Sequence, residues 1–185
     1  MKKQYNLFIL LFLCTFFNSC IFDKENPEPE KPDRGFTVVV GQQAPPLTIT
    51  YLDGKTVSLA SLKGKVVMLQ FAASWCKVCQ KVMPIVESRI WGKYKANPNF
   101  VLVGICKGEN KDAVLKFIET SGVTYPLIPD EDASKFLLFA EKDAGVTRNV
   151  LIGENGKIAF LTRLYQEEEF AELDKKIEEL LLDTK

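Results

Sequence analysis

Cys76 and Cys79 are the residues of this 185-residue chain whose type and spacing can carry chemistry. They follow an apolar run at residues 66–71 that is typical of a buried strand, and a helical pattern begins at Cys76. The dithiol is therefore expected where a strand passes into a helix. The partial positive charge of a helix N-terminus stabilises a thiolate there, so the pattern predicts thiol–disulfide exchange.

The two thiols are expected to have different roles. Cys76 stands at the helix start and should be exposed and nucleophilic, whereas Cys79 lies one turn further in and should resolve the mixed disulfide. Lys77 adds a positive charge beside them that favours the thiolate. The alternative interpretation is an inert buried pair of thiols, which a helix start disfavours.

The composition excludes several other kinds of site. The chain contains no histidine, so a His-based triad and His metal ligands are excluded. A single CxxC without histidine lacks the ligands of a four-coordinate zinc site. We therefore predict no metal and no cofactor other than a redox-active Cys76–Cys79 disulfide.

The N-terminus has the pattern of an export signal. Lys2 and Lys3 precede an apolar stretch at residues 7–17 that is too short to span a bilayer comfortably. Ser19 then stands directly before Cys20, and a small residue before Cys resembles the lipobox of bacterial lipoproteins. We predict a signal peptide at 1–19, a lipid anchor on Cys20 and a location in the cell envelope, facing the periplasm or the cell exterior. An ordinary secretory signal with an incidental Cys20 is the alternative.

The rest of the chain divides into a tether and a domain. Residues 23–34 are charged, contain three prolines and lack apolar residues, so residues 20–35 are predicted to be a lipidated Cys followed by a disordered tether. The folded domain is expected at 36–185. Removal of residues 1–19 takes away two of 24 basic residues and none of 24 acidic ones. The resulting charge of about −2 argues against nucleic-acid binding.

Periodicity within 36–185 predicts an α/β fold. Residues 47–51 and 56–59 flank Asp53-Gly54 and indicate an N-terminal β-hairpin. Strands and helices then follow in alternation, and the chain ends in a hairpin with an Asn155-Gly156 turn and a last helix. The expected strands are 66–71, 100–105, 125–128, 149–152 and 157–161, and the expected helices begin at Cys76 or cover 111–120, 133–142 and the segment after Glu167. Together they form a mixed sheet covered by helices on both faces.

Residues 41–182 resemble the TlpA-like and ResA-like branch of the thioredoxin-fold oxidoreductases. The resemblance rests on Trp75-Cys76 with Cys79, on Met83-Pro84, on Asp53-Gly54 and on the runs at 62–67 and 156–158. It implies a thioredoxin-like fold, protein thiol or disulfide substrates, a redox partner protein and, for this branch, reduction as the direction. Pro84 matches the proline that kinks the family's active-site helix.

Three positions depart from the family pattern. Thr147 stands where the family has a cis-proline, so a trans peptide and altered substrate docking are expected. Gln70 replaces a buried carboxylate that relays protons, and Val82 replaces a Glu of the cytochrome-maturation members. Arg148, beside Thr147, either lies by the dithiol, where it stabilises the thiolate or binds an acidic peptide, or is simply solvated.

Two residues outside the motif are read as structural. Cys106 is expected to be a partly buried thiol at a strand end. Glu109 is expected to be part of a solvated helix start.

Two other functions remain open. A thiol peroxidase is possible because the flanks also resemble the AhpC/TSA group, although Ala73 and Leu69 stand where peroxidatic sites carry Thr or Ser and Pro. A non-catalytic binding lipoprotein on a thioredoxin scaffold is the other, and the missing cis-proline favours it slightly.

Overall fold

The computed structural model describes residues 34–183. The predicted signal peptide, the lipidation site at Cys20 and nearly all of the predicted tether lie outside this range. Within residues 34–183 there is no helix of the length and apolar character needed to cross a bilayer.

A mixed five-stranded sheet forms the centre of the molecule, as predicted. Its strands lie in the order β5-β4-β3-β6-β7. β3 pairs in parallel with β4, which pairs in parallel with β5, whereas β6 and β7 are antiparallel to their neighbours. The strands are β3 (Val66–Ala72), β4 (Phe100–Lys107), β5 (Leu127–Asp130), β6 (Arg148–Ile152) and β7 (Ile158–Arg163).

The central strands are apolar on both faces because both faces are covered. Every residue of β3 is buried, which explains why its residues are apolar on both faces, apart from Gln70, rather than alternating. Gly104, in the middle of β4, provides space for its neighbour. A Cβ atom at this position would lie 2.3 Å from Cδ2 of Leu127 and 3.3 Å from Cε2 of Tyr125.

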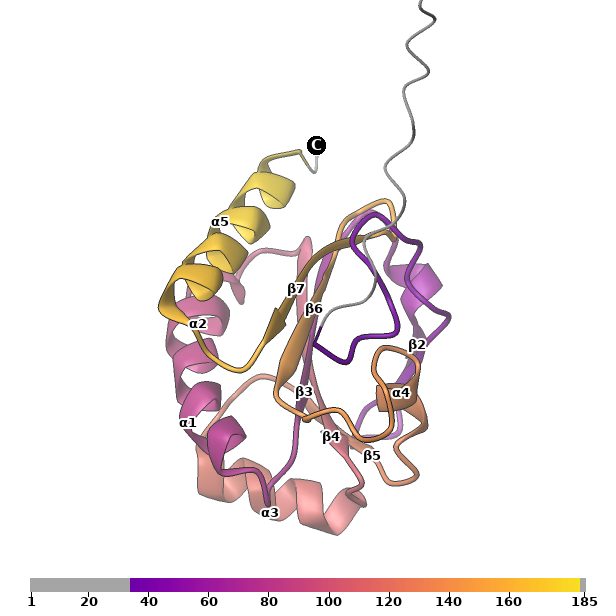
Figure 1. Cartoon of the computed structure of the whole chain (residues 1–185), viewed down its shortest axis with the longest axis vertical. Helices are drawn as coiled ribbons and strands as arrows, with labels where there is room; N and C mark the ends of the chain where they lie inside the picture. Colours follow the sequence, from indigo (N-terminus) through magenta and orange to yellow (C-terminus); the bar gives the residue numbers. More distant parts are fainter. Residues whose placement is uncertain (1–33, 184–185) are drawn as a thin grey trace, which may run out of the picture.

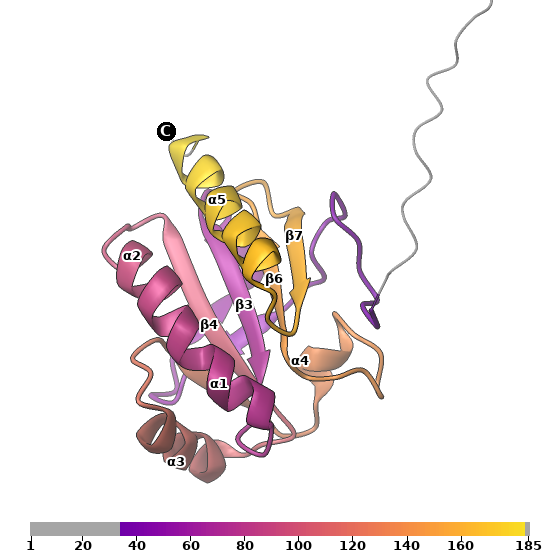
Figure 2. The same ribbon diagram turned by 60° about the vertical axis from the view of Figure 1, so that its left-hand side comes forward.

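Figures 1 and 2 show the covering layers on the two sides of the sheet. One side carries the active-site helix with its continuation, the last helix and, next to the active-site helix, α3. These are α1 (Lys77–Val86), a π-helical turn η2 (Glu87–Trp91), α2 (Gly92–Tyr94), α3 (Lys111–Ser121) and α5 (Glu167–Asp183). The other side carries the N-terminal segment with the predicted hairpin and a short helix. These are β1 (Thr48–Thr50), β2 (Thr56–Ser58), the 3₁₀ turn η1 (Leu59–Leu62) and α4 (Ser134–Leu137). The thioredoxin-like arrangement with an N-terminal hairpin is thereby confirmed.

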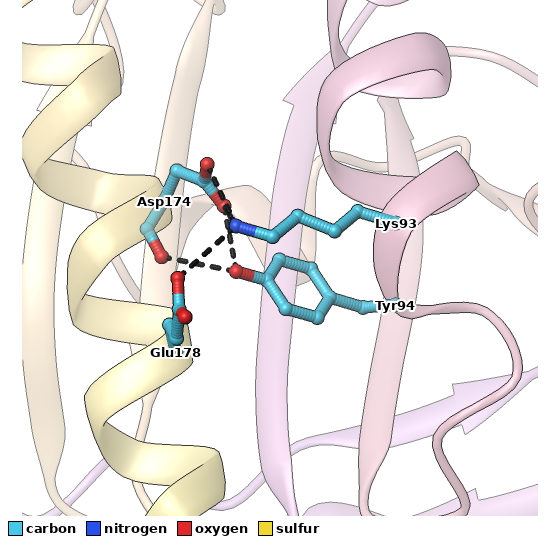
Figure 3. A network of polar contacts seen from close by, with 4 residues as sticks. All are labelled: Lys93, Tyr94, Asp174 and Glu178. Atoms are coloured by element: carbon cyan, nitrogen blue, oxygen red, sulfur yellow. Dashed lines mark hydrogen bonds and ion pairs between the residues drawn. The ribbon is translucent and has the colours of Figure 1, made fainter.

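The far end of the active-site helix is joined to α5 by a polar network (Figure 3). Lys93 Nζ lies 3.1 Å from Asp174 Oδ1 and 3.2 Å from Glu178 Oε2, and the Tyr94 hydroxyl donates to Asp174 Oδ1 at 2.7 Å. Burial, together with Asp174, raises the pKa of Tyr94 to about 12 despite the nearby Lys93. The phenol therefore remains a donor at neutral pH and holds α2 against α5.

Two predicted elements differ from the structure. The prediction of a helix over 133–142 is wrong, because only Ser134–Leu137 is helical within this range. The backbone turns after it, so that Ala140 pairs with Phe36 of the N-terminal segment. The last parallel strand is Leu127–Asp130 and so lies two residues later than expected. Pro129 is tolerated within it because β5 is an edge strand.

Candidate active site

Cys76 caps the N-terminus of α1, as the sequence predicted. Its sulfur accepts a hydrogen bond from the backbone N–H of Cys79 at 3.2 Å. The Cys79 thiol lies 2.7 Å from Cys76 Sγ, and both cysteines are free thiols. Cys76 is half-buried, whereas Cys79 is only 1% exposed. Cys76 is therefore the more accessible of the two thiols, as expected, although it is half-buried rather than exposed.

Thr147 is the third member of the site. It lies directly before β6, and its hydroxyl is 3.3 Å from Cys76 Sγ and 3.1 Å from Cys79 Sγ. No peptide bond among residues 34–183 is cis, which agrees with the expected trans geometry at Thr147. Its carbonyl accepts the N–H of Leu164 at 3.0 Å. The residue in the place of the family's proline thus adds a hydroxyl to the dithiol.

The two thiols are shifted in opposite directions. Burial raises the pKa of Cys76, but hydrogen bonds from the Cys79 thiol, the Thr147 hydroxyl and the backbone amides of Cys79 and Val78 outweigh it, so that the net pKa is lowered. Burial, with the neighbouring Cys76, raises the pKa of Cys79 to about 12. Lys77 is exposed on the first turn, and the hydrogen bonds, rather than its charge, account for the lowered pKa.

Beneath the dithiol the interior contains Gln70, Tyr125 and Cys106, all buried. The Tyr125 hydroxyl donates to Gln70 Oε1. Burial raises the pKa of Tyr125, and the charges of Glu87, Cys106 and Cys79 raise it further. Cys106 is fully buried within β4, opposite Ala72; the expectation of a partly buried strand end is wrong, because β4 continues to Lys107.

The expectation of a solvated Glu109 is also wrong. Its side chain is 4% exposed, and Oε1 accepts hydrogen bonds from the Ser74 hydroxyl and, at 2.8 Å, from the Ser74 backbone N–H. The helix begins at Lys111, as expected, because Asn110 is its N-cap and accepts from Ala113 N–H. Glu109 is therefore free to turn inward, and it fixes the loop two residues before Cys76. No local sequence pattern marked this role, because the contact joins residues 35 positions apart.

Both interpretations of Arg148 are wrong. The side chain is fully buried on the other side of β6, where it donates to the carbonyls of Gly145 and Gly35. Its guanidinium lies 4.5 Å from the ring centroid of Phe36 and 5.4 Å from that of Phe136. Burial and two neighbouring arginines lower its pKa to about 10, which leaves it charged at neutral pH. Arg148 therefore joins the N-terminal segment to the loop that carries Thr147.

Apolar surface lies beside Cys76. Trp75 is 64% exposed and Val78 is also exposed, although large apolar side chains are usually buried. Pro84 is inside α1, as predicted, and the helix changes to a π-helical turn three residues later, where the Glu87 N–H reaches the carbonyls of both Met83 and Pro84. An exposed tryptophan beside a half-buried thiol suits contact with a partner that brings its own sulfur to Cys76.

The sequence matches a known family over most of this fold. A model of the AhpC/TSA family matches residues 40–161. The thiol-disulfide oxidoreductase ResA of Bacillus subtilis (strain 168) is 29% identical over 167 residues, which cover 85% of each protein. ResA of Geobacillus kaustophilus (strain HTA426) is 32% identical over 162 residues, covering 85% of this chain and 87% of the relative.

Solved structures agree with this assignment. A solution structure of a candidate protein disulfide isomerase from Bacteroides thetaiotaomicron is 55% identical, with a TM-score of 0.77, and the match covers 80% of this chain and 94% of that protein. A candidate thiol:disulfide interchange protein DsbE from Chlorobium tepidum is 25% identical, with a TM-score of 0.67 and coverage of 78% and 99%. The chain therefore belongs to the AhpC/TSA family, and within it to the ResA-like thiol–disulfide oxidoreductases with a thioredoxin-like fold.

Proposed function

We propose that this protein is a membrane-anchored, extracytoplasmic reductase of protein disulfides, with Cys76 as its nucleophile and Cys79 as its resolving thiol. The redox-active Cys76–Cys79 pair serves as its only cofactor, and a separate redox protein returns the pair to the dithiol. The observation that carries the proposal is the difference between the two thiols. One is half-exposed with a lowered pKa, and the other is buried with a raised pKa.

Reduction of a substrate proceeds in two displacements. The Cys76 thiolate attacks one sulfur of the substrate disulfide; a Cys76–substrate bond forms, and the other substrate sulfur leaves as a thiolate. Cys79 then loses its proton and attacks Cys76 Sγ, 2.7 Å away in the dithiol. The Cys76–Cys79 disulfide forms and the second substrate thiolate leaves. The substrate gains two electrons, which the dithiol loses.

The attack step follows from the way the site is built. A thiolate, rather than a thiol, is the nucleophile, and the Cys76 sulfur is surrounded by donors: the amides of Val78 and Cys79, the Cys79 thiol and the Thr147 hydroxyl. These donors stabilise negative charge on Cys76 before the substrate arrives. The exposed Trp75 and Val78 supply apolar contact for the protein that carries the disulfide.

The anchor is proposed from the N-terminal sequence. Lys2, Lys3, the short apolar stretch and Ser19-Cys20 support a lipid on Cys20. The twelve residues 23–34 could reach on the order of 35 Å if they adopt polyproline II. Such a tether would hold the domain clear of the lipid surface and leave Trp75 and Cys76 free to meet large substrates. Metabolic labelling with a clickable fatty acid tests this, since Cys20→Ala should abolish incorporation.

A direct test of the chemistry compares single-cysteine variants in exchange with insulin and with glutathione disulfide. We expect Cys76→Ser to abolish exchange and Cys79→Ser to accumulate a mixed disulfide at Cys76. Cys106→Ser should retain exchange, which makes it the matched control for the loss of one sulfur. An inactive wild-type protein would refute the proposal, and so would full activity of Cys76→Ser.

The same protein tests the two alternatives. The family match keeps peroxidase activity as a second candidate, but Ala73 and Leu69 are both buried and apolar and offer no hydroxyl to a peroxide. Consumption of hydrogen peroxide at a rate that exceeds disulfide exchange would favour the peroxidase.

A non-catalytic binding protein would keep its disulfide oxidised in cells. Alkylation of intact cells should instead trap a substantial reduced fraction of Cys76 and Cys79.

A further inference from the structure

The resolving step of the proposed reaction needs an internal proton acceptor. Cys79 is buried and its pKa is raised to about 12, so its thiol holds its proton at neutral pH. Gln70 lies in this interior in place of a carboxylate, and an amide does not accept a proton under these conditions. Tyr125 is also unsuitable, because its raised pKa keeps it protonated.

Two buried carboxylates lie at this end of the sheet, and their bonding differs. Asp130 uses both oxygens, since Oδ1 and Oδ2 each accept a backbone N–H at 2.9 Å, from Lys135 and Phe136. Glu109 uses only Oε1, which accepts from Ser74. Its other oxygen, Oε2, is buried and has no hydrogen-bond partner among residues 34–183. A carboxylate oxygen left without a donor in the interior is costly, so its presence calls for an explanation.

Cys106 lies at the same end of the sheet as Glu109 and the loop before the dithiol. Its thiol is fully buried on β4, next to the last residue of β3. Burial raises the pKa of Cys106, and the charges of both Glu109 and Cys79 raise it further. The backbone N–H of Ala73 bonds to the Cys79 sulfur, and the N–H of the next residue, Ser74, donates to Glu109 Oε1 at 2.8 Å. Glu109 and the resolving thiol therefore bind neighbouring amides of one loop, at the end of β3 where Ala72 pairs with Cys106.

We propose that Glu109 accepts the proton of Cys79 during the resolving step, in the region beside Cys106. This inference rests on the proposed function. The Sγ–H bond of Cys79 breaks, and an O–H bond forms at Glu109 Oε2. The Cys79–Cys76 bond forms as the bond between Cys76 and the substrate sulfur breaks, and the electron pair leaves with that sulfur. Glu109 afterwards passes the proton to the departing thiolate or to solvent, which restores the carboxylate.

The test is Glu109→Gln, which keeps an Oε1 acceptor for Ser74 but cannot take up a proton. Attack is measured alone in the Cys79→Ser background, as the rate of mixed-disulfide formation with glutathione disulfide. Resolution is measured with both cysteines present, as the release of the second glutathione at saturating disulfide. We expect Glu109→Gln to slow resolution at pH 7 by about ten- to a hundredfold, since general base catalysis contributes at least that much. Attack in the Cys79→Ser background should change less than about twofold.

The pH profile separates proton transfer from a structural role. The deficit should shrink as the pH rises, because hydroxide then removes the Cys79 proton directly. Glu109→Asp should recover part of the rate, and Asp112→Asn, an equivalent change at an exposed position nearby, should leave both steps unchanged. Resolution at the wild-type rate throughout the pH range would overturn the inference. So would an equal, pH-independent slowing of both steps, because that would mark Glu109 as a brace for Ser74. If the wild-type protein exchanges disulfides, either result refutes the role of Glu109 but not the proposed function. If the wild-type protein does not exchange disulfides, the proposed function itself is refuted.

Discussion

The replacement of Thr147 by valine isolates one of the donors that act on Cys76. Valine keeps the branched shape of threonine but has no hydroxyl, so it removes the contacts at 3.3 Å to Cys76 Sγ and 3.1 Å to Cys79 Sγ. The Cys79 thiol and the amides of Val78 and Cys79 remain as donors to Cys76. Thr147 lies directly before β6 and is buried. Because valine has the same branched shape, we expect the register of β6 to be unchanged. We expect the pKa of Cys76 to rise.

The size of this rise follows from the energy of a hydrogen bond to a charged group. Such bonds contribute roughly 1.5–3 kcal/mol net, and the lower value applies here because Cys76 is half-exposed and the hydroxyl is shared between two sulfurs. Since one pKa unit corresponds to about 1.4 kcal/mol, the pKa of Cys76 should rise by about one unit. Below that pKa the thiolate fraction falls about tenfold. Each thiolate becomes about threefold more nucleophilic, so the observed rate should fall only about threefold.

Iodoacetamide alkylation of the reduced protein measures this effect over a range of pH. The modified residue is identified by mass spectrometry, so that reaction at Cys79 or Cys106 is counted separately. Thr147→Ser keeps the hydroxyl and serves as the matched control, with a profile like that of the wild type. If Thr147→Val and Thr147→Ser give the same midpoint, the hydroxyl does not stabilise the thiolate. The lowered pKa of Cys76 would then have to come from the Cys79 thiol and the helix amides.

Two further predictions concern the interior beneath the dithiol. Gly104→Ala should lower the free energy of unfolding by about 1–3 kcal/mol in urea titrations, because its Cβ would overlap Leu127; the double variant with Leu127→Ala should lose less than the sum of the single losses, and strict additivity would refute the clash. The folded pKa of Cys106 lies above its unfolded value, so the stability linked to this thiol is complete below the unfolded pKa of about 8.5 and is lost as the pH rises above it. Cys106→Ala should therefore flatten the alkaline fall in unfolding free energy of the reduced protein, and an unchanged slope would contradict the burial argument.

The features predicted correctly depend on short stretches of sequence. The passage from β3 to α1 is encoded within a few residues: a continuous apolar run, two thiols three apart and a four-residue apolar repeat. The cap at Cys76 and the burial of Cys79 follow from helix geometry alone. The hairpin turns at Asp53-Gly54 and Asn155-Gly156 are likewise local. These parts of the fold and of the site needed no knowledge of distant partners.

The features predicted wrongly depend on partners far away in the sequence. In the sequence, Arg148 has the character of a surface charge. In the structure, Phe36 and Phe136 lie against its guanidinium, and the carbonyl of Gly35 accepts a hydrogen bond from it. Glu109 has the sequence position of a helix start, but in the structure it accepts a hydrogen bond from Ser74, 35 residues earlier. The helix after Ala133 ends at Leu137, because the backbone that follows it pairs with Phe36 through Ala140. No local pattern in the sequence encodes any of these three contacts.

The role of Thr147 could be located in the sequence but not understood from it. Counting along the family pattern places a threonine where a proline is usual, which suggested a trans peptide and altered substrate docking. The structure adds what the position gains, a donor within 3.3 Å of both sulfurs. A donor favours the thiolate over the disulfide, and a stabilised thiolate makes a dithiol less reducing. Burial of Cys79 acts in the opposite direction, because it disfavours the charged form of the second thiol. The reducing strength of this site is therefore a balance between the hydroxyl of Thr147 and the apolar surroundings of Cys79.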